Sequence, residues 1–581
     1  MPYHPIKKKI VRRAPSAKPA APLGHLPPLL QRIYAARKLD DAKELDRSLN
    51  QLPSPWLLSG MEAMAERLAE AIVHRRSLLV VADYDADGAT ACAVAVRGLK
   101  ALGLERVSYL VPNRFEYGYG LTPEIVALAA PRRPDILLTV DNGISALEGA
   151  DAAKARGLEL LITDHHTPGA ELPDAAAIVN PNLPGDAFPG KSLAGVGVMF
   201  YVLMALRQRL RDGGRHARPG ASEPNLAKLL DLVALGTVAD VVPLDHVNRI
   251  LVHQGLQRIR SEQASPGILA LLNVAGRKPR QASAADLGFS AGPRLNAAGR
   301  LDDMSLGIEC LLADNPGAAS DMAAQLDGMN KARRELENQM KQEALAYLDT
   351  LDVPVGDKSA LCLFDETWHQ GVIGLVASRV KDLANRPVVV FAPAGDGLVK
   401  GSVRSIQGIH IRDALSDINT QNPRLIRQFG GHAMAAGLSL RRDDLPRFAE
   451  LFEREANRRL GAADLEHAVH TDGTLENHEL DLVVAEQLRQ AGPWGHGFPE
   501  PLFDGEFEVA QRRVLGDKHL KLVLRPMGGN KEIDAIAFGL AEPADWLDCR
   551  TLRAAYRLDV NEFRDTRVAQ LRIEYMESGT A

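Results

Sequence analysis

Cysteine and long apolar stretches are scarce in this sequence. Its 581 residues include four cysteines, which lie far apart and form no Cys-x-x-Cys pair. This spacing argues against a zinc site built on cysteines and against a small disulfide-stapled scaffold. It suits a reducing compartment, so we expect a cytoplasmic protein. No run of about 18 apolar residues occurs, so we expect no membrane span.

An excess of either charge is also missing. The sequence has 69 Lys and Arg against 74 Asp and Glu, a net charge of −5. Its 46% hydrophobic and 25% charged residues are ordinary for globular proteins. These values exclude a wholly disordered chain and a histone-like protein that binds nucleic acid by bulk charge. They leave nucleic acid open as a substrate, because basic residues can gather locally.

The first 25 residues lack the apolar segment that a signal peptide needs. Five basic residues between Lys7 and Arg13 precede a stretch rich in Ala and Pro. We therefore expect a disordered basic tail over residues 1–25 rather than a dedicated nucleic-acid-binding arm.

Short apolar runs alternate with helical stretches after this tail. This alternation predicts a parallel sheet that is covered by helices on both faces. We place strands at residues 77–83, 106–112, 135–141, 158–164 and 176–180, a helix from about Ala89, and a buried helix at 226–238.

Three further regions complete the predicted α/β architecture. Residues 318–351 have helical apolar spacing, which predicts a long amphipathic helix linking two lobes rather than a coiled-coil arm. A second, smaller α/β region follows, and after the Gly- and Pro-rich residues 492–501 come five strand-like runs typical of an antiparallel OB-type barrel. The predicted parts are the tail (1–25), the parallel-sheet domain with N-terminal helices (26–315), the linking helix (316–352), the smaller α/β domain (353–462) and the barrel (463–581).

Acidic and histidine residues follow three of the predicted strands. The carboxyl ends of parallel strands meet at one edge of a sheet, where ligands bind. Carboxylates so close together repel one another, and a bound divalent cation relieves that repulsion. A single aspartate here would more often be a helix cap, and Asp240 alone is typical of a helix end. The strand-end residues are Asp83, Asp85, Asp87, Asp141, Asp164, His165 and His166.

This residue set favours particular cations. It is rich in oxygen, includes imidazole and lacks thiolate, which suits Mg²⁺ or Mn²⁺. The ligands outnumber what one catalytic ion needs, so we expect two ions ~4 Å apart, an arrangement that performs in-line displacement at phosphorus. One ion would activate water, and both would stabilise the charge on the phosphoryl oxygens.

Several stretches also resemble a known family. Residues 80–91, 139–145, 162–169 and 234–244 resemble the four motifs of the DHH phosphoesterase superfamily, named for the Asp-His-His triplet found here at 164–166. Residues 429–437 resemble the Gly-Gly-His motif of its companion DHHA1 domain. Residues 293–303, 368–380 and 556–564 narrow the resemblance to the single-strand-specific 5′→3′ DNA exonucleases of the superfamily. The resemblance covers residues 26–575.

The resemblance implies a role for each strand-end residue. Asp85 and Asp87 would each take one ion, and Asp141 would bridge the two. His165 and Asp240 would complete the second ion, while His166 would face the scissile phosphate as a donor or proton source. Many family members have a histidine where this chain has Val81, so Asp83 is the expected substitute ligand. The implied catalytic residues are His166, Asp141 and Asp87, and the implied metal ligands are Asp83, Asp85, Asp87, Asp141, His165 and Asp240.

The resemblance also implies contacts to DNA. Glycines in the DHHA1-like region let backbone approach a phosphate, and an arginine fork matches phosphate oxygens. Recognition of a terminal phosphate by Arg404, His432 and their neighbours would give the 5′ polarity. Basic residues of the barrel would follow a single strand. The implied contacts are Arg294, Asn296, Arg300, Arg379, Ser402, Arg404, Gly430, Gly431, His432, Lys518 and Lys521.

The implied activity is hydrolysis of single-stranded DNA from its 5′ end to 5′-mononucleotides, in DNA recombination and repair, with two Mn²⁺ or Mg²⁺ ions. The expected partners are single-stranded DNA, a single-strand-binding protein and a helicase, and the chain is expected to be a monomer. Two alternatives stay open. One is a DHH phosphoesterase for short oligonucleotides or cyclic dinucleotides, a class that usually lacks the barrel. The other is a non-catalytic DNA-binding scaffold, a class that has lost metal ligands.

Overall fold

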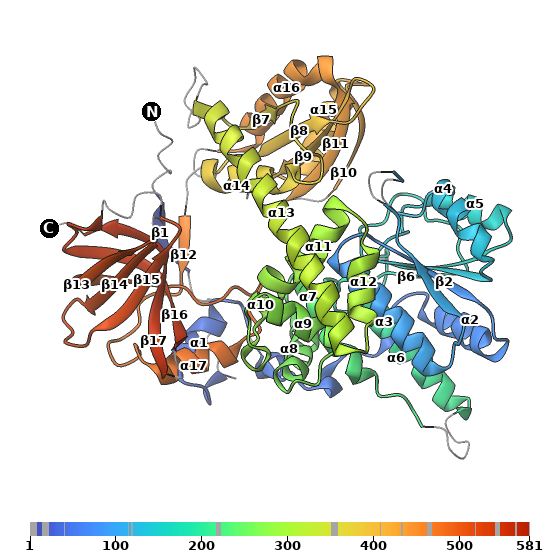
Figure 1. Cartoon of the computed structure of the whole chain (residues 1–581), viewed down its shortest axis with the longest axis horizontal. Coiled ribbons are helices and arrows are strands. Elements are labelled where there is room, and N and C mark those ends of the chain that lie inside the picture. The colour runs from blue at the N-terminus through green and yellow to red at the C-terminus, as the bar shows by residue number, and fades with distance from the viewer. Residues whose placement is uncertain are drawn as a thin grey trace. The chain divides into compact units, whose positions relative to one another are not determined.

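A computed structural model gives the fold (Figure 1). It describes residues 8–13, 23–39, 41–113, 116–117, 120–215, 222–349, 358–406, 408–431, 434–461, 468–516, 519–540, 546–563 and 566–579. The chain divides into two compact units. The first unit comprises residues 15–330 and 487–500, and the second comprises residues 1–14, 331–486 and 501–581.

The first unit is built on a five-stranded parallel sheet of order β3-β2-β4-β5-β6. Its central strands are apolar on both faces, as in LLVVA of β2 and ILLTV of β4, because helices cover both sides. Every neighbouring pair is parallel, so the carboxyl ends of the strands lie at one edge. The strands are β2 (Leu78–Ala82), β3 (Val107–Leu110), β4 (Ile136–Val140), β5 (Glu159–Thr163) and β6 (Ala177–Val179).

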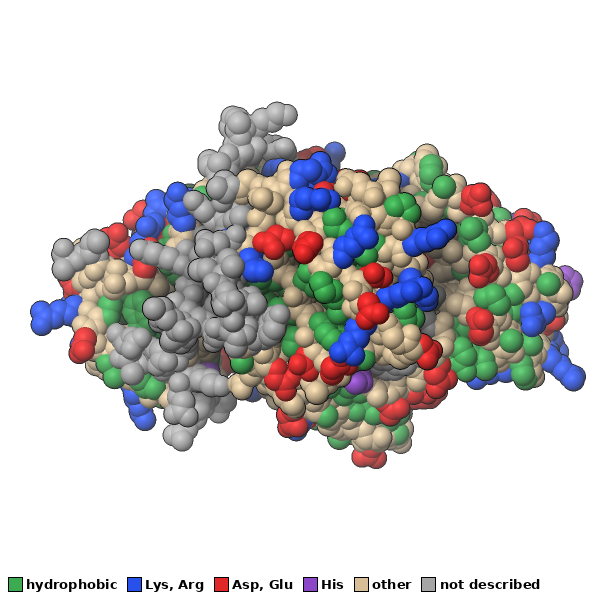
Figure 2. Space-filling model, turned by 90° about the horizontal axis from the view of Figure 1, so that it is seen from above, with side chains coloured by type: hydrophobic (Ala, Val, Ile, Leu, Met, Phe, Trp, Pro, Cys, Tyr) green, Lys and Arg blue, Asp and Glu red, His purple; other side chains and the backbone are tan. Residues whose placement is uncertain are grey.

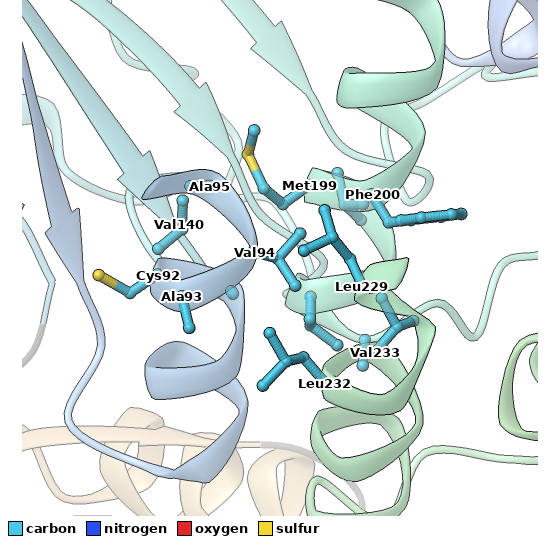
Figure 3. Close-up of a cluster of buried hydrophobic side chains, with 14 of the residues drawn as sticks. Cys92, Ala93, Val94, Ala95, Val140, Met199, Phe200, Leu229, Leu232 and Val233 are labelled. Atoms are coloured by element: carbon cyan, nitrogen blue, oxygen red, sulfur yellow. The ribbon is translucent and has the colours of Figure 1, made fainter. Parts of the chain in front are cut away.

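Helices cover the two faces of this sheet with different cores. On one face α4 and α5 pack over residues such as Leu79 and Ile162, and on the other α2, α3 and α6 pack over residues such as Val80 and Leu138. Figure 3 shows Val94 of α3 in the second of these cores, together with Leu232 and Val233 of α7. The covering helices are α2 (Met61–Val73), α3 (Ala86–Leu102), α4 (Pro123–Ala129), α5 (Leu147–Ala155) and α6 (Gly195–Asp212).

A helical layer completes the first unit. Its helix α7 is buried over most of its length, which agrees with the apolar sequence around it. A single π-helical turn, η9 (Leu287–Ala291), leads directly into α11. The other helices are α1 (Pro28–Ala35), α7 (Leu230–Ala239), α8 (His246–Arg260), α9 (Pro266–Val274), α10 (Ala284–Asp286), α11 (Gly292–Leu301) and α12 (Ser305–Leu312), with short 3₁₀ turns η2 (Ala42–Leu45), η3 (Leu49–Gln51), η4 (Pro55–Leu57), η5 (Ala130–Arg132), η7 (Leu226–Leu229) and η8 (Pro279–Gln281).

The second unit contains a mixed sheet of order β10-β11-β9-β8-β7. Only β7 and β8 pair in parallel, and the other pairs are antiparallel. Helix α14 packs on one face, and α15 and α16 pack on the other. Its elements are β7 (Leu361–Phe364), α14 (Ile373–Ala384), β8 (Val388–Pro393), β9 (Leu398–Arg404), α15 (Ile411–Gln421), β10 (Ile426–Gly431), β11 (Ala435–Arg441), η11 (Arg442–Asp444) and α16 (Leu445–Arg459), and the long helix α13 (Pro316–Asp349) precedes them.

A closed five-stranded barrel follows in the second unit, with order β13-β14-β15-β17-β16. The parallel-sheet domain, the smaller α/β domain and the OB-type barrel are thereby confirmed, with the refinement that β15 and β17 run parallel. The barrel strands begin only at Phe503, after β12 (Ala468–Thr471) and α17 (Leu482–Ala491). They are β13 (Phe503–Leu515), β14 (His519–Pro526), β15 (Ile533–Phe538), β16 (Thr551–Phe563) and β17 (Thr566–Ser578).

The expected disorder of residues 1–25 is wrong for part of that segment. Residues Lys9–Arg12 form strand β1, which pairs in parallel with β12. The Arg12 guanidinium binds the buried Asp504 carboxylate at the start of the barrel, with Nη2 2.7 Å from Oδ2. Arg13 likewise binds Asp472, at 3.0 Å. Two of the five basic residues that suggested a loose tail, Arg12 and Arg13, are therefore partners of buried acids.

The surface has no dominant sign of charge on the face that Figure 2 presents, where basic and acidic side chains are interspersed. Among the described residues, no helix is both long enough and apolar enough to cross a membrane.

Candidate metal centre and phosphate-binding face

The acidic edge of the first sheet gathers side chains around His165. Its Nε2 lies 3.1 Å from Asp141 Oδ1, 3.5 Å from Asp240 Oδ2 and 3.9 Å from Asp87 Oδ2. Asp141 and His165 follow β4 and β5, and Asp240 follows α7 (Leu230–Ala239), whereas Asp87 lies in the first turn of α3. Elements far apart in the sequence therefore bring carboxylates and an imidazole to one point, as parallel topology requires.

The loop after β2 is held by hydrogen bonds to its own carboxylates. Asp85 caps α3, and its Oδ1 accepts from the backbone N–H groups of Asp87 and Gly88 at 2.9 and 3.0 Å. Asp87 is buried and accepts from the N–H groups of Gly195 and Val196, at 2.6 and 3.0 Å, in the first turn of α6. That helix end stabilises the negative charge of Asp87.

Gly195 is required by a close approach. A Cβ atom at this position would lie 2.6 Å from Asp141 Cβ and 2.6 Å from its Oδ1. Any side chain here would therefore displace the Asp141 carboxylate. Asp141 itself adopts a left-handed backbone conformation, with φ of 62°. Such strain in a non-glycine residue is typical of functional sites.

Asp164 fixes the orientation of the two histidines. Its Oδ1 accepts from the backbone N–H groups of His165 and His166 at 2.7 and 3.1 Å, and lies 2.7 Å from His166 Nδ1. Its Oδ2 accepts from Ile144 N–H at 2.9 Å. Burial alone would raise the pKa of Asp164, but the hydrogen bond and charge of His166 hold it below its usual value. Asp164 therefore stays ionised and acts as a positioning residue.

The electrostatics of the cluster reflect crowded negative charge. Burial raises the pKa of Asp87 to about 7, and Asp85 adds to the effect. Burial and then the neighbouring carboxylates also raise the pKa values of Asp141 and Asp240 well above the usual range. Burial lowers the pKa of His166, but Asp164 outweighs that effect and raises it to about 9. A cation between the carboxylates would remove this repulsion.

The donor set fits divalent cations in two separate groups, which a third group links. Ligand atoms of Asp83, Asp85 and Asp141 lie within 4.8 Å of one another, and so do those of Asp87, His165 and Asp240. A third group of Asp141, His165 and His166 overlaps both. The first group is all oxygen and the second includes imidazole, as Mg²⁺ or Mn²⁺ accepts. All six sequence-predicted ligands are thus brought together, while the assignment of each to an ion stays a prediction.

The predicted DNA contacts on α11 have different surroundings. Asn296 Oδ1 accepts from Ala86 N–H at 2.8 Å, so it supports the loop that carries Asp85 and Asp87. Arg294 is buried and binds Asp327 of α13 at 2.7 Å, and its Nη1 donates to Ser290 O at 2.7 Å. Because the Arg294 guanidinium is buried and already paired with a carboxylate, the structure does not support the DNA contact predicted for it. Arg300 is half-buried near the end of α11.

A second group of predicted residues lies on the mixed sheet. Ser402 and Arg404 share one face of β9, and Arg404 Nη1 donates to Ser402 Oγ at 3.0 Å. Burial lowers the pKa of Arg404. A Cβ atom on Gly374, in the first turn of α14, would lie 2.8 Å from Arg404 Nη2 and 3.0 Å from Ser402 Oγ. A guanidinium, a hydroxyl and a helix N-terminus therefore meet, and each favours an anion.

Glycines extend this face beyond α14. Ser402 is paired with Gly437 of β11, which is paired with Gly430 of β10, so the three residues form a row across the sheet. Among the described residues, and apart from its own chain neighbours, no atom lies within 4 Å of the place where a Cβ of Gly430 would stand. Gly431 ends β10 with φ of 140°. His432 lies outside the described residues. We call the surface formed by Gly374, Ser402, Arg404, Gly430 and Gly437 the glycine face.

The remaining predicted contacts are dispersed. Arg379 on α14 is exposed and binds Glu337 Oε1 of α13 at 3.0 Å. Lys521 on β14 lies 3.5 Å from Asp534 Oδ2 on the barrel. Lys518 lies outside the described residues. The structure thus groups the metal-ligand candidates and the glycine-face residues, each within its own unit, but not the basic residues of the barrel.

Sequence reasoning missed several residues that hold the cluster. Asn182 Nδ2 donates to His165 O at 2.6 Å, and Asn180 Nδ2 donates to His166 O at 2.9 Å. Asn142 Nδ2 ties the ends of β2 and β4 through Val81 O and Val140 O at 3.1 and 2.9 Å. The sequence positions of these three asparagines could have indicated their role, because Asn142 follows Asp141 directly and Asn180 and Asn182 lie in the loop after β6. The role of Gly195 had no local signal.

The fold and the site together define a DHH-type phosphoesterase. Residues 77–237 match the model of the DHH family N-terminal domain, and residues 357–458 match the DHHA1 domain. Residues 471–575 match the RecJ OB domain.

Full-length relatives narrow the class. The chain is 51% identical over 573 residues to the single-stranded-DNA-specific exonuclease RecJ of Dickeya dadantii, covering 97% of this chain and 98% of the relative. It is 49% identical over 578 residues to that of Escherichia coli, covering 98% and 99%. The structure of RecJ from Thermus thermophilus in complex with Mn²⁺ matches with a TM-score of 0.78 and 30% identity, covering 99% of this chain and 80% of that chain. The same protein was also solved with Mg²⁺, with a TM-score of 0.75. The chain belongs to the RecJ family.

Proposed function

We propose that the protein is a single-stranded-DNA-specific exonuclease that hydrolyses DNA from the 5′ end and releases 5′-mononucleotides. The observation that carries this proposal is the complete cluster of six candidate ligands in a chain that aligns with RecJ proteins over nearly its whole length. Two Mn²⁺ or Mg²⁺ ions would supply Lewis acidity and an activated water at this cluster. Asp83, Asp85, Asp87, Asp141, His165 and Asp240 are the residues that would hold them.

The chain's own residues supply orientation and proton donation. Asp164 holds His166 through Nδ1, at 2.7 Å, so that the rest of the ring is fixed relative to the cluster. The raised pKa of His166, about 9, keeps the ring protonated near neutral pH. A protonated imidazole donates a hydrogen bond to a phosphate oxygen or a proton to the leaving oxygen. His166 is therefore the proposed donor, and Asp164 is its positioning residue.

The glycine face is the proposed site for the terminal 5′-phosphate. Arg404 would donate to phosphate oxygens through its guanidinium, Ser402 through its hydroxyl, and the first turn of α14 through its N–H groups. The absence of side chains at Gly430 and Gly437 leaves room for a nucleotide backbone. Recognition of that phosphate is the proposed source of 5′ polarity.

Two observations weigh against the alternatives. A phosphoesterase for short oligonucleotides or cyclic dinucleotides does not need a domain for longer strands, whereas this chain has a closed barrel of the RecJ OB type. A non-catalytic scaffold does not need to keep metal ligands, whereas every candidate carboxylate and both histidines are in place.

The cellular setting follows as part of the same proposal. We expect a monomer that acts in the cytoplasm in DNA recombination and repair. Because the enzyme degrades only single strands, a helicase would have to open duplexes for it, and a single-strand-binding protein would cover the same substrate. Sedimentation and pull-down with these proteins would test this setting.

Digestion of end-labelled oligonucleotides tests the activity. Single- and double-stranded 30-mers labelled at the 5′ or 3′ end are incubated with Mn²⁺, Mg²⁺ or EDTA. We expect early release of labelled mononucleotide from the 5′-labelled single strand, a shrinking ladder from the 3′-labelled one, and no hydrolysis in EDTA. Early mononucleotide release from the 3′ label would refute the polarity. A preference for dinucleotides over the 30-mer would favour the short-oligonucleotide alternative, and binding without cleavage would favour the scaffold.

A further inference from the structure

Two large apolar side chains are exposed on segments that adjoin the metal cluster. Phe289 in η9 is 78% exposed, the highest value for a large hydrophobic side chain among the described residues. Val241 is 62% exposed and follows directly after Asp240, a candidate metal ligand. A single exposed apolar residue is ordinary, but an exposed aromatic and a second apolar residue at the border of a site need an explanation.

Close packing brings the two segments that carry these side chains together. The turn η9 packs against α7, the helix that ends just before Asp240. A Cβ on Gly288 would lie 3.1 Å from Val238 Cγ1, and a Cβ on Gly292 would lie 3.0 Å from Ala239 Cβ. Phe289 stands between these two glycines in the sequence. Its backbone is therefore held against the last turn of α7, one or two residues before the cluster.

The same segment is attached to the other side of the cluster. Helix α11 continues from η9, and its Asn296 accepts from Ala86 N–H at 2.8 Å, between Asp85 and Asp87. Residues 288–296 thus span from the Asp240 end of the cluster to the loop after β2. The backbone of such a segment has a fixed position relative to both ligand-bearing loops.

Backbone strain in Val241 and in η9 supports a functional role for these two segments. Val241 has φ of 62°, a left-handed conformation that is rare for a β-branched residue. Its carbonyl lies 2.8 Å from His496 Nδ1, a contact that helps to hold it there. η9 is a π-helical turn, a feature that is frequent at functional sites. The left-handed backbone of Val241 and the π-helical turn of Phe289 do not serve to bury these two side chains, because both are exposed.

We propose that Phe289, with Val241 beside it, is a stacking platform for a nucleobase of the DNA strand next to the scissile phosphate. The inference rests on the proposed function, which places a phosphodiester at the cluster. A base attached to that nucleotide lies close to the ligands, and the segment that carries Phe289 packs on the last turn of α7, next to Asp240. An aromatic face binds every base by its π-face without reading its edge, so the platform would position DNA without sequence preference. Phe289 is therefore assigned as a positioning residue.

A substrate series with abasic sites tests this role. Oligonucleotides with one abasic site at each of the first four 5′ positions are hydrolysed by the wild type and by Phe289→Ala. On intact DNA we expect kcat/KM of the variant to fall about tenfold, which corresponds to ~1.4 kcal/mol. At the one position whose base stacks on Phe289, wild type and variant should be equally slow. An equal loss on every abasic substrate, or no loss on intact DNA, would overturn the proposal.

A fluorescence measurement in EDTA removes the dependence on hydrolysis. An oligonucleotide with 2-aminopurine at the position found above should be quenched on binding by the wild type and by Phe289→Trp. Phe289→Ala and Phe289→Leu should not quench it, because neither has a π-face. Quenching by the Leu variant would mean that the contact is only apolar. Val73→Ala on α2, at a side chain that is 66% exposed, is the matched control and should behave as wild type.

These readouts separate the two proposals. No hydrolysis by the wild type on any substrate would refute the proposed function. Hydrolysis by the wild type with an unaffected Phe289→Ala would refute the platform alone. Because Phe289 is exposed, its replacement should leave the thermal unfolding temperature unchanged, and this is checked for each variant.

Discussion

The two five-stranded sheets of the molecule differ in the charge of the side chains that they gather. The parallel sheet of the first unit collects carboxylates at its carboxyl edge, where burial and mutual repulsion raise the pKa values of Asp87, Asp141 and Asp240. The mixed sheet of the second unit presents glycines beside Arg404, whose pKa is lowered by burial. One sheet carries a candidate cation site, and we propose that the other receives an anion. A phosphodiesterase that recognises a terminal phosphate needs both.

The difference also shows how each site tolerates change. The cation site depends on the positions of many charged groups, which are fixed by buried hydrogen bonds such as those of Asp164. The proposed phosphate site depends on the space beside its glycines and on one guanidinium. Loss of a carboxylate should therefore abolish chemistry, whereas loss of the guanidinium should weaken recognition of one group.

The largest effect is expected from Asp141→Ala. Without this carboxylate the all-oxygen group loses one of its three members, and so does the group that links it to His165. Lewis-acid stabilisation worth several kcal/mol is then lost. We expect at least about a thousandfold lower kcat with Mn²⁺ on a single-stranded oligonucleotide. The matched control is Asp135→Ala, at the opposite end of the same strand β4. Equal losses in both variants would mean that the sheet, not the cluster, had been damaged.

A smaller effect is expected from Asp164→Asn, which keeps the shape of the side chain but removes the charge that orients His166. Replacing such a positioning residue costs about 10- to 100-fold in activity or metal affinity. Single-turnover hydrolysis measures the loss of activity, and Mn²⁺ titration measures the loss of metal affinity. Asp231→Asn is the control, because Asp231 is also fully buried but lies on α7, away from the histidines. Wild-type rates for Asp164→Asn would contradict the positioning role.

Arg404→Ala should act on recognition alone. A charge-assisted hydrogen bond is worth ~1.5–3 kcal/mol, so we expect the preference for a 5′-phosphate over a 5′-hydroxyl to fall about tenfold to a hundredfold. The rate on the 5′-hydroxyl substrate should change little. Arg412→Ala, on α15 at the other face of the same sheet, is the control. An unchanged phosphate preference would contradict the proposal that the glycine face binds the terminal 5′-phosphate.

The smallest effect concerns the strand β1 and has no bearing on either site. Arg12→Ala leaves Asp504 with its bond from Thr471, at 2.7 Å. Because the Arg12 side chain is 57% exposed, we expect only about 1 kcal/mol of barrel stability to be lost. Hydrogen exchange of β13 and β16 measures this loss, and Lys9→Ala on the same strand is the control.

The pH dependence of that loss has a definite sign. Burial would raise the pKa of Asp504, but hydrogen bonds from Arg12 and Thr471 lower it below the usual value. A carboxylate with a lowered pKa stabilises the fold above its unfolded pKa of about 3.9 and loses that contribution as pH falls through the folded value. The difference between wild type and Arg12→Ala should therefore be full at pH 6 and shrink below pH 4. A constant difference would contradict the ion pair.

The amino-acid sequence predicted the strands of the first sheet and the barrel because their apolar runs are short, regular and bounded by turns. It predicted the metal cluster because parallel strands bring their ends together. It could not predict that Gly195 and Val196 bind Asp87, because that contact joins residues more than a hundred positions apart through the packing of α6. Arg294 is similar, since its burial depends on the path of α13. The strand β1 was missed because four residues gain their structure only by pairing with β12.

The most direct test of the central claim is the number of Mn²⁺ ions bound by the wild type and by Asp141→Ala, measured by electron paramagnetic resonance alongside hydrolysis of a 5′-labelled single strand. The account predicts two ions and rapid hydrolysis for the wild type, and at most one ion with no hydrolysis for the variant. Full hydrolysis by Asp141→Ala, or a wild type that hydrolyses DNA with a single bound ion, would contradict it.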